Sequence, residues 1–192
     1  RVRDTTYDEK TWQLNVQAGK TLRTEGSSWL QKFTYGFDYT HTNVETLQTG
    51  LTPAAGETFP LKRFPDSKES STAFYIQDEI ASDHWIITPG VRYDRYKLDA
   101  SANGYASSIA PASLNDAAVS PKLGVLFRAT SEWSVFGNYA SGFKAPDASQ
   151  VNSYRESGSF PFYKTIPNPD LRPEKSRNFE VGVRGRTGGL SL

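Results

Sequence analysis

Apolar and polar residues alternate with a period of two along most of this chain. The clearest case is the segment 119–129, in which Val119, Leu123 and Phe127 share one parity while polar or small residues fill much of the other. Successive side chains of a β-strand point to opposite faces, so this alternation predicts a strand with one apolar and one polar face. The same signal predicts strands that begin near residues 12, 33, 74, 85, 119, 133 and 179, and the start of another at residue 190.

The connections between these strands are of two kinds, which alternate along the chain. Short turns lie around residues 25–28, 82–84, 130–132 and 187–189, and long loops lie at about 50–70, 100–117 and 143–175. Short turns at one edge and long loops at the other are the pattern of outer-membrane β-barrels, whereas a soluble β-sandwich is not expected to alternate so regularly. We therefore predict an all-β, antiparallel transmembrane barrel with the long loops on the extracellular side.

Parity alone leaves open whether the apolar face points outward into lipid or inward into a soluble barrel core. Aromatic residues make up 13% of the chain and include ten tyrosines, and Trp85 and Trp133 each follow a short turn directly. Tyrosine and tryptophan gather at membrane interfaces, which favours the lipid-facing alternative together with the loop pattern. Charged residues of the polar parity would then face a polar lumen: Lys32, Asp38, Glu79, Arg92, Asp94, Lys122, Arg128, Glu180 and Arg184.

The composition removes several other classes of function. The 22 Lys+Arg residues balance 21 Asp+Glu residues, so the chain has no broad basic surface for nucleic acid. Cysteine is absent, which excludes a disulfide framework and thiolate metal sites. Seven strands and part of an eighth do not close a barrel, and an open sheet edge is not tolerated in lipid. We therefore expect residues 1–192 to be part of a larger barrel.

The segment 143–174 is the most informative long loop. It begins Phe-Lys-Ala-Pro, ends Ile-Pro-Asn-Pro-Asp-Leu-Arg-Pro-Glu, and contains five prolines. Proline disfavours both a regular helix and a central strand, so we predict no secondary structure of its own in this loop. A structureless loop of this length is usually functional or disordered, and the recurring prolines favour a shaped binding loop.

The two ends of this loop carry a resemblance to a known family. The segments 141–146 and 168–174 resemble the FRAP…NPNL signature of TonB-dependent outer-membrane receptors for haem and haemoglobin. The segments 89–94 and 119–124 are similar to strands shared by TonB-dependent receptors in general. The resemblance implies that Phe143, Ala145, Pro146, Asn168, Pro169, Asp170 and Leu171 form the motif that shapes the loop, and from the residues alone Asn168 and Asp170 serve its turn geometry.

That resemblance also implies a plugged barrel of roughly 22 strands in the bacterial outer membrane. Its plug and its TonB-contacting part would lie outside this sequence. The implied cargo is haem, taken free or from a haemoglobin-type source, and the implied partners are that source, TonB and outer-membrane lipid. Nucleic acid is not an expected partner.

Family members typically hold haem iron with a histidine in this loop, and here the loop has none. Tyrosinate also ligates ferric haem, so Tyr163 is the first candidate for the iron ligand and Tyr154 the second. The cations Lys144, Arg155 and Lys164, together with Arg172, are candidates for binding the haem propionates. For all of these residues, loop packing or simple solvation remains the alternative.

No enzyme is predicted, because no catalytic motif or metal-ligand spacing stands out. The two histidines are expected to be structural, with His41 on the apolar parity near the outer rim and His84 in a short turn. A ferric-siderophore receptor of the same architecture is the main alternative to haem uptake. A small outer-membrane barrel enzyme or a porin is the second alternative.

Overall fold

The computed structural model describes residues 3–23, 25–51, 53, 58–107, 109–157, 160–187 and 190–191. Eight strands form one antiparallel sheet in which each strand pairs with the next along the chain, apart from an insertion between β6 and β9. The strands are β1 (Arg3–Arg23), β2 (Leu30–Gly50), β3 (Ser67–Ala81), β4 (Trp85–Ala100), β5 (Leu114–Arg128), β6 (Trp133–Lys144), β9 (Glu174–Thr187) and β10 (Leu190–Ser191).

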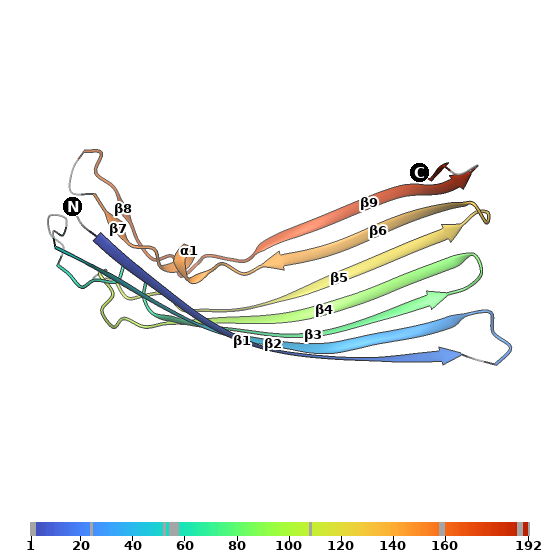
Figure 1. Ribbon diagram of the computed structural model, residues 1–192, viewed down its shortest axis with the longest axis horizontal. Helices are drawn as coiled ribbons and strands as arrows, with labels where there is room; N and C mark the ends of the chain where they lie inside the picture. Colours follow the sequence, from blue (N-terminus) through green and yellow to red (C-terminus); the bar gives the residue numbers. More distant parts are fainter. Residues whose placement is uncertain are drawn as a thin grey trace.

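The curved sheet separates its two kinds of connection, as Figure 1 shows. The short turns gather at one end of the sheet and the long loops at the other. Strands β1 and β2 have 21 residues each, about twice the 9–11 that a tilted strand needs to cross a bilayer. These two strands therefore continue beyond a membrane-spanning band toward the long loops. The all-β antiparallel fold and the alternation of short turns with long loops are confirmed.

The apolar side chains of neighbouring strands share one face, called the outer face below. Phe37, Phe74, Tyr93 and Val119 lie side by side on four successive strands. The rings of Phe37 and Phe74 are 5.0 Å apart between centroids. Phe74 is nevertheless 55% exposed and Val181 83% exposed, so no other part of the described chain covers this face. A contiguous exposed apolar surface of this kind is what a barrel presents to lipid.

Phe136 departs from the alternation because its ring fills the space above a glycine on the inner, polar face. A Cβ placed on Gly182 would lie 2.4 Å from Phe136 Cζ, so only glycine leaves room for the ring. The guanidinium of Arg184 lies 5.7 Å from the centre of the same ring. This cation–π contact gives an aromatic residue a polar neighbour inside the lumen.

The buried core of the described chain lies at the long-loop end of the sheet, not along the strands. Leu98 of β4 and Val151 are fully buried, and they pack with Tyr96, Ala112 and Ala148. Val151 belongs to a short helix, α1 (Ala148–Asn152), within the loop between β6 and β9. The prediction that this loop has no secondary structure was therefore wrong. Within the described residues, no helix is long and apolar enough to cross a membrane.

Candidate ligand platform at the long-loop end

The described parts of the three long loops, 58–66, 101–113 and 145–173, bind to one another and form what we call the loop platform. The backbone of Lys62 pairs with the second loop, donating to the carbonyl of Gly104 at 3.2 Å and accepting from Ala106 at 2.8 Å. The backbone N–H of Tyr154 donates to the carbonyl of Arg63 at 3.4 Å, which ties the third loop to the first. The platform is thus one interlocked unit.

Asn152 locks the third loop onto the second. Its side chain is fully buried and accepts from the Ala112 N–H at 2.6 Å while its Nδ2 donates to the Ala112 carbonyl at 2.8 Å. The hydroxyl of Tyr105 donates to the Asn152 carbonyl at 2.8 Å. Burial raises the pKa of Tyr105, so this phenol stays protonated and keeps donating. Asn152 mimics a strand partner for Ala112 and satisfies both of its backbone groups.

The helix α1 begins with a capping box. The two residues that form it can be read in the sequence, but a helix of five residues is too short to show a periodic pattern. Asp147 Oδ1 accepts from the Gln150 N–H at 2.9 Å, and Gln150 Oε1 accepts from the Asp147 N–H at 3.0 Å. Burial would raise the pKa of Asp147, but hydrogen bonds from Ser149 and Gln150 and the nearby Lys144 outweigh it and lower the pKa. The N–H of Ala148 donates to Glu69 Oε1 on β3 at 3.2 Å, which fixes the helix to the inner face.

Four of the six candidate haem-binding residues lie in or next to one small hairpin. It consists of β7 (Arg155–Glu156) and β8 (Lys164–Thr165) and projects from the platform (Figure 1). The guanidinium of Arg155 lies 5.8 Å from the centre of the Tyr163 ring, and Lys164 Nζ lies 5.6 Å from that of Tyr154. The structure therefore brings Tyr154, Arg155, Tyr163 and Lys164 together.

The hairpin divides these residues between two faces. Glu156 pairs with Lys164 and Arg155 with Thr165, so side chains at 154, 156 and 164 share one face, and those at 155, 163 and 165 the other. On the first face, Tyr154 donates to Glu156 Oε2 at 2.7 Å and Lys164 lies 3.4 Å from the same oxygen. The Tyr154 hydrogen bond, with Lys164, lowers the pKa of Glu156. On the second face, Tyr163 is 45% exposed beside Arg155.

The remaining predicted residues lie at the base of the loop. Lys144 ends β6 opposite Glu174 of β9, away from the hairpin. Asn168 shapes the turn as expected, because its Oδ1 accepts from the Asp170 N–H at 3.0 Å. Its own N–H donates to the Val151 carbonyl at 2.8 Å, and Leu171 packs against the buried core. Phe143 lies in β6, followed by Ala145 and Pro146 before α1, and Pro169 lies within the turn.

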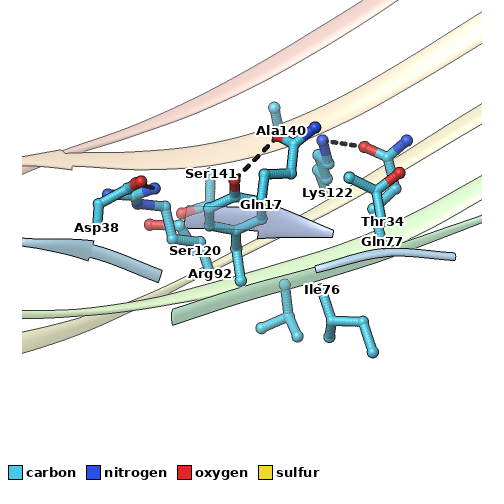
Figure 2. A pocket seen from close by; sticks show the side chains of 12 residues that line it. Gln17, Thr34, Asp38, Ile76, Gln77, Arg92, Ser120, Lys122, Ala140 and Ser141 are labelled. Atoms are coloured by element: carbon cyan, nitrogen blue, oxygen red, sulfur yellow. Dashed lines mark hydrogen bonds and ion pairs between the residues drawn. The ribbon is translucent and has the colours of Figure 1, made fainter. Parts of the chain in front are cut away.

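A second candidate site is a polar hollow of about 460 Å³ on the inner face of the sheet (Figure 2). Arg92 Nη1 donates to Asp38 Oδ2 at 2.6 Å, and its Nε donates to Asp94 Oδ1 at 2.9 Å. Lys122 donates to the neutral amide of Gln77 at 2.5 Å. The side chain of Ile76 points the opposite way, toward the outer face. The lining of the hollow is therefore hydrophilic, and its arginine is already paired with two carboxylates of the same face.

No group of three His, Cys, Asp or Glu side chains in the described part of the chain is placed to hold a metal ion. His41 lies on the outer face, with its ring centre 6.1 Å from that of Trp12. The carbonyl of His84 accepts from the Arg128 N–H in a short turn. The site residues that sequence reasoning missed are Asn152, Tyr105 and Val151, and the one available signal was the Asp147–Gln150 capping box.

These features define a class of protein: a lipid-facing barrel wall with a polar interior and an interlocked loop platform at one end. A family described as TonB dependent receptor-like, beta-barrel, matches residues 2–192. The chain belongs to this family, whose barrels are outer-membrane proteins of Gram-negative bacteria.

Two relatives illustrate the likeness in sequence. The chain is 28% identical over 159 residues to the hemin receptor of Yersinia pestis, a match covering 78% of this chain and 22% of that protein. It is 30% identical over 117 residues to the metal-pseudopaline receptor CntO of Pseudomonas aeruginosa, covering 58% of this chain and 14% of that protein.

The solved structure of a double mutant of the Serratia marcescens hemophore receptor HasR, in complex with its hemophore HasA and heme, is similar in fold. The TM-score is 0.73 at 16% identity, and the match covers 97% of this chain and 31% of that chain. The chain thus spans about a fifth of the hemin receptor and about a third of HasR.

Proposed function

We propose that this chain is the wall and ligand-gripping loop of a TonB-dependent outer-membrane transporter for haem. The observation that carries the proposal is the hairpin β7–β8, which gathers tyrosines, cations and exposed aromatic rings within the loop platform. The relative named a hemin receptor supports the same cargo. Both relatives and the solved structure described above are receptors by name, which supports a role in binding and transport without chemical change.

Tyr163 is the proposed iron ligand. Its phenol belongs to the hairpin face that also carries Arg155, whose guanidinium lies 5.8 Å from the ring centre. Phenolate is an established ligand of ferric haem, and the nearby guanidinium could pair with a haem propionate. Phe160 is 88% exposed and Phe162 75% exposed, which leaves two rings available to stack on a flat porphyrin.

Because Tyr154 belongs to the other face of the hairpin, it is not expected to reach the same iron. Its hydroxyl bonds to Glu156 at 2.7 Å. Lys164 shares that face, so its proposed role is to bind a propionate at the edge of the hairpin. Lys144 belongs to the base of the loop and is proposed to act on cargo that passes inward.

Hemin titration into the complete receptor that carries this chain tests the proposal. Tyr163→Phe should weaken saturable hemin binding by about tenfold or more and shift the Soret band, because it removes the iron ligand. Tyr154→Phe, on the opposite face, is the matched control and should change affinity less than twofold. Absence of a saturable Soret shift in the unmodified receptor would exclude haem as the cargo. Equal effects of the two substitutions would exclude Tyr163 as the ligand.

A ferric or other metal chelate of the siderophore class is the second candidate cargo. The likeness to a metal-pseudopaline receptor favours it, and so does the absence of histidine from the loop sequence. Saturable binding of a ferric siderophore, with no competition by hemin, would select this alternative. In either case we propose that uptake depends on TonB, so abolishing the membrane proton gradient should stop uptake while leaving surface binding intact.

A further inference from the structure

The second long loop carries the one asparagine of the sequence that is followed directly by glycine, Asn103–Gly104. Both residues are exposed. The N–H of Tyr105 donates to the Ala102 carbonyl at 3.2 Å, so residues 102–105 form a β-turn with Asn103 and Gly104 at its centre. Gly104 has a φ of +69°, a left-handed conformation that glycine adopts without steric cost.

The reacting groups of this turn are free, whereas those of other asparagines are held. Within the described residues, neither the Asn103 carboxamide nor the Gly104 N–H makes a hydrogen bond, and Asn103 is bonded through its backbone N–H to Ser101 Oγ at 3.3 Å. Asn152 is buried with both carboxamide atoms bonded to Ala112. The Asn115 carboxamide accepts from Arg95 at 3.3 Å.

We propose that Asn103–Gly104 is a modification site at which the chain deamidates without an enzyme. The Gly104 nitrogen bonds to Asn103 Cγ while the Cγ–Nδ2 bond breaks, and Nδ2 leaves as ammonia with the proton of the Gly104 N–H. Water then opens the five-membered succinimide that results. Attack at the side-chain carbonyl gives aspartate, and attack at the main-chain carbonyl gives isoaspartate, with no change of oxidation state. Glycine permits the ring because no side chain shields its nitrogen.

The same turn joins the second loop to the first. The Gly104 carbonyl accepts from the Lys62 N–H at 3.2 Å, and the Lys62 carbonyl accepts from the Ala106 N–H at 2.8 Å. Isoaspartate lengthens the main chain by one methylene directly before Gly104 and adds a negative charge, so the spacing of these two bonds is lost. Tyr105, whose hydroxyl holds the Asn152 carbonyl at 2.8 Å, lies between them. The modification therefore loosens the loop platform, and it does so whatever the cargo is.

Ageing of the complete receptor tests the proposal. The receptor is incubated at mildly alkaline pH, digested with trypsin under mildly acidic conditions, and sequenced by electron-transfer mass spectrometry, which distinguishes isoaspartate from aspartate. The tryptic peptide 98–122 contains both Asn103 and Asn115, so each digest carries its own reference. Asn103 should lose ammonia about tenfold faster than Asn115, or faster still, because only Asn103 precedes a glycine.

Hydrogen exchange then measures the effect on the platform. The aged wild type should exchange faster in residues 58–66 and 101–113 than the fresh protein, with the strands unchanged. Asn103→Gln, which disfavours the five-membered ring, should keep its protection on ageing, and the control Asn178→Gln, on the inner face of β9, should age as the wild type does.

Two outcomes would overturn the assignment of the site. One is loss of ammonia from Asn103 no faster than from Asn115, and the other is a rate in the folded receptor far below that in the urea-unfolded chain, which would show that the turn protects the residue. Unchanged exchange in the aged, isoaspartate-containing receptor would overturn the consequence for the platform. Because no cargo takes part in either measurement, these results stand apart from the hemin titration.

Discussion

The barrel wall and the loop platform of this chain are stabilised in different ways. In the wall, seven long strands pair through their backbones while large apolar side chains such as Phe74 and Val181 stay exposed. In the platform, Val151 and Asn152 are fully buried and loops meet through specific side-chain contacts. The wall therefore depends on backbone pairing and lipid, whereas the platform depends on individual buried side chains.

The two regions should therefore respond differently to substitution. A wall position tolerates many side chains provided that each keeps the polarity of its face, because the strand ladder does not use the side chain. A buried platform position tolerates few, since its partners are left without hydrogen bonds or packing. Three substitutions, taken from the largest expected effect to the smallest, test the comparison.

A positive charge on the outer face should be the most damaging change. Ile76→Arg places a guanidinium within the apolar band, where Tyr35 and Val91 are its cross-strand neighbours. The expected cost is about 2–4 kcal/mol in the free energy of unfolding. Denaturant titration of the receptor in lipid vesicles measures it. Asn138→Arg, on the inner face beside Glu180, is the control and should cost less than about 1 kcal/mol. Similar losses for both would contradict the assignment of the faces.

The second largest effect is expected at Asn152, whose side chain joins the loop 145–173 to the loop 101–113. Asn152→Leu keeps the side-chain volume but leaves the N–H and C=O of Ala112 without partners, at about 2–3 kcal/mol. The loss should be local, so hydrogen exchange should accelerate in residues 105–112 and 145–157 and stay slow in the strands. Asn178→Leu, exposed on the inner face of β9, is the control. Uniform acceleration across the wall would show that the platform is not a separate stabilising unit.

The same comparison explains what the sequence predicted and what it did not. The strands were predictable because their faces are set by a period-two pattern that is local, as in 119–129. Phe136 broke that pattern, and only the pairing with Gly182 on β9 explains it. The helix α1 was missed because five residues show no periodicity and because its burial depends on Leu98, far away in the chain. Asn152 gave no sign of its role, since its partner Ala112 lies in another loop.

The smallest expected effect concerns the cap of α1 and its dependence on pH. The folded-state pKa of Asp147 is lowered, so the carboxylate stabilises the helix above the ordinary pKa of aspartate, and this contribution is lost as pH falls through the lowered value. Asp147→Ala should cost about 1 kcal/mol of local stability at neutral pH. Hydrogen exchange of residues 148–152, corrected for the intrinsic effect of pH, measures both effects.

Asp147→Asn separates the charge from the cap. Asparagine caps a helix about as well as aspartate, so this variant should keep most of the stability at neutral pH and lose its pH dependence. The strand amides of β4 provide the internal reference, because their protection comes from the pairing with β3 and β5. A helix that loosens equally in both proteins at low pH would assign the effect to another group. If low pH accelerates exchange of the helix only in the protein with aspartate at position 147, and the strand amides stay protected, then the platform can be opened without disturbing the wall.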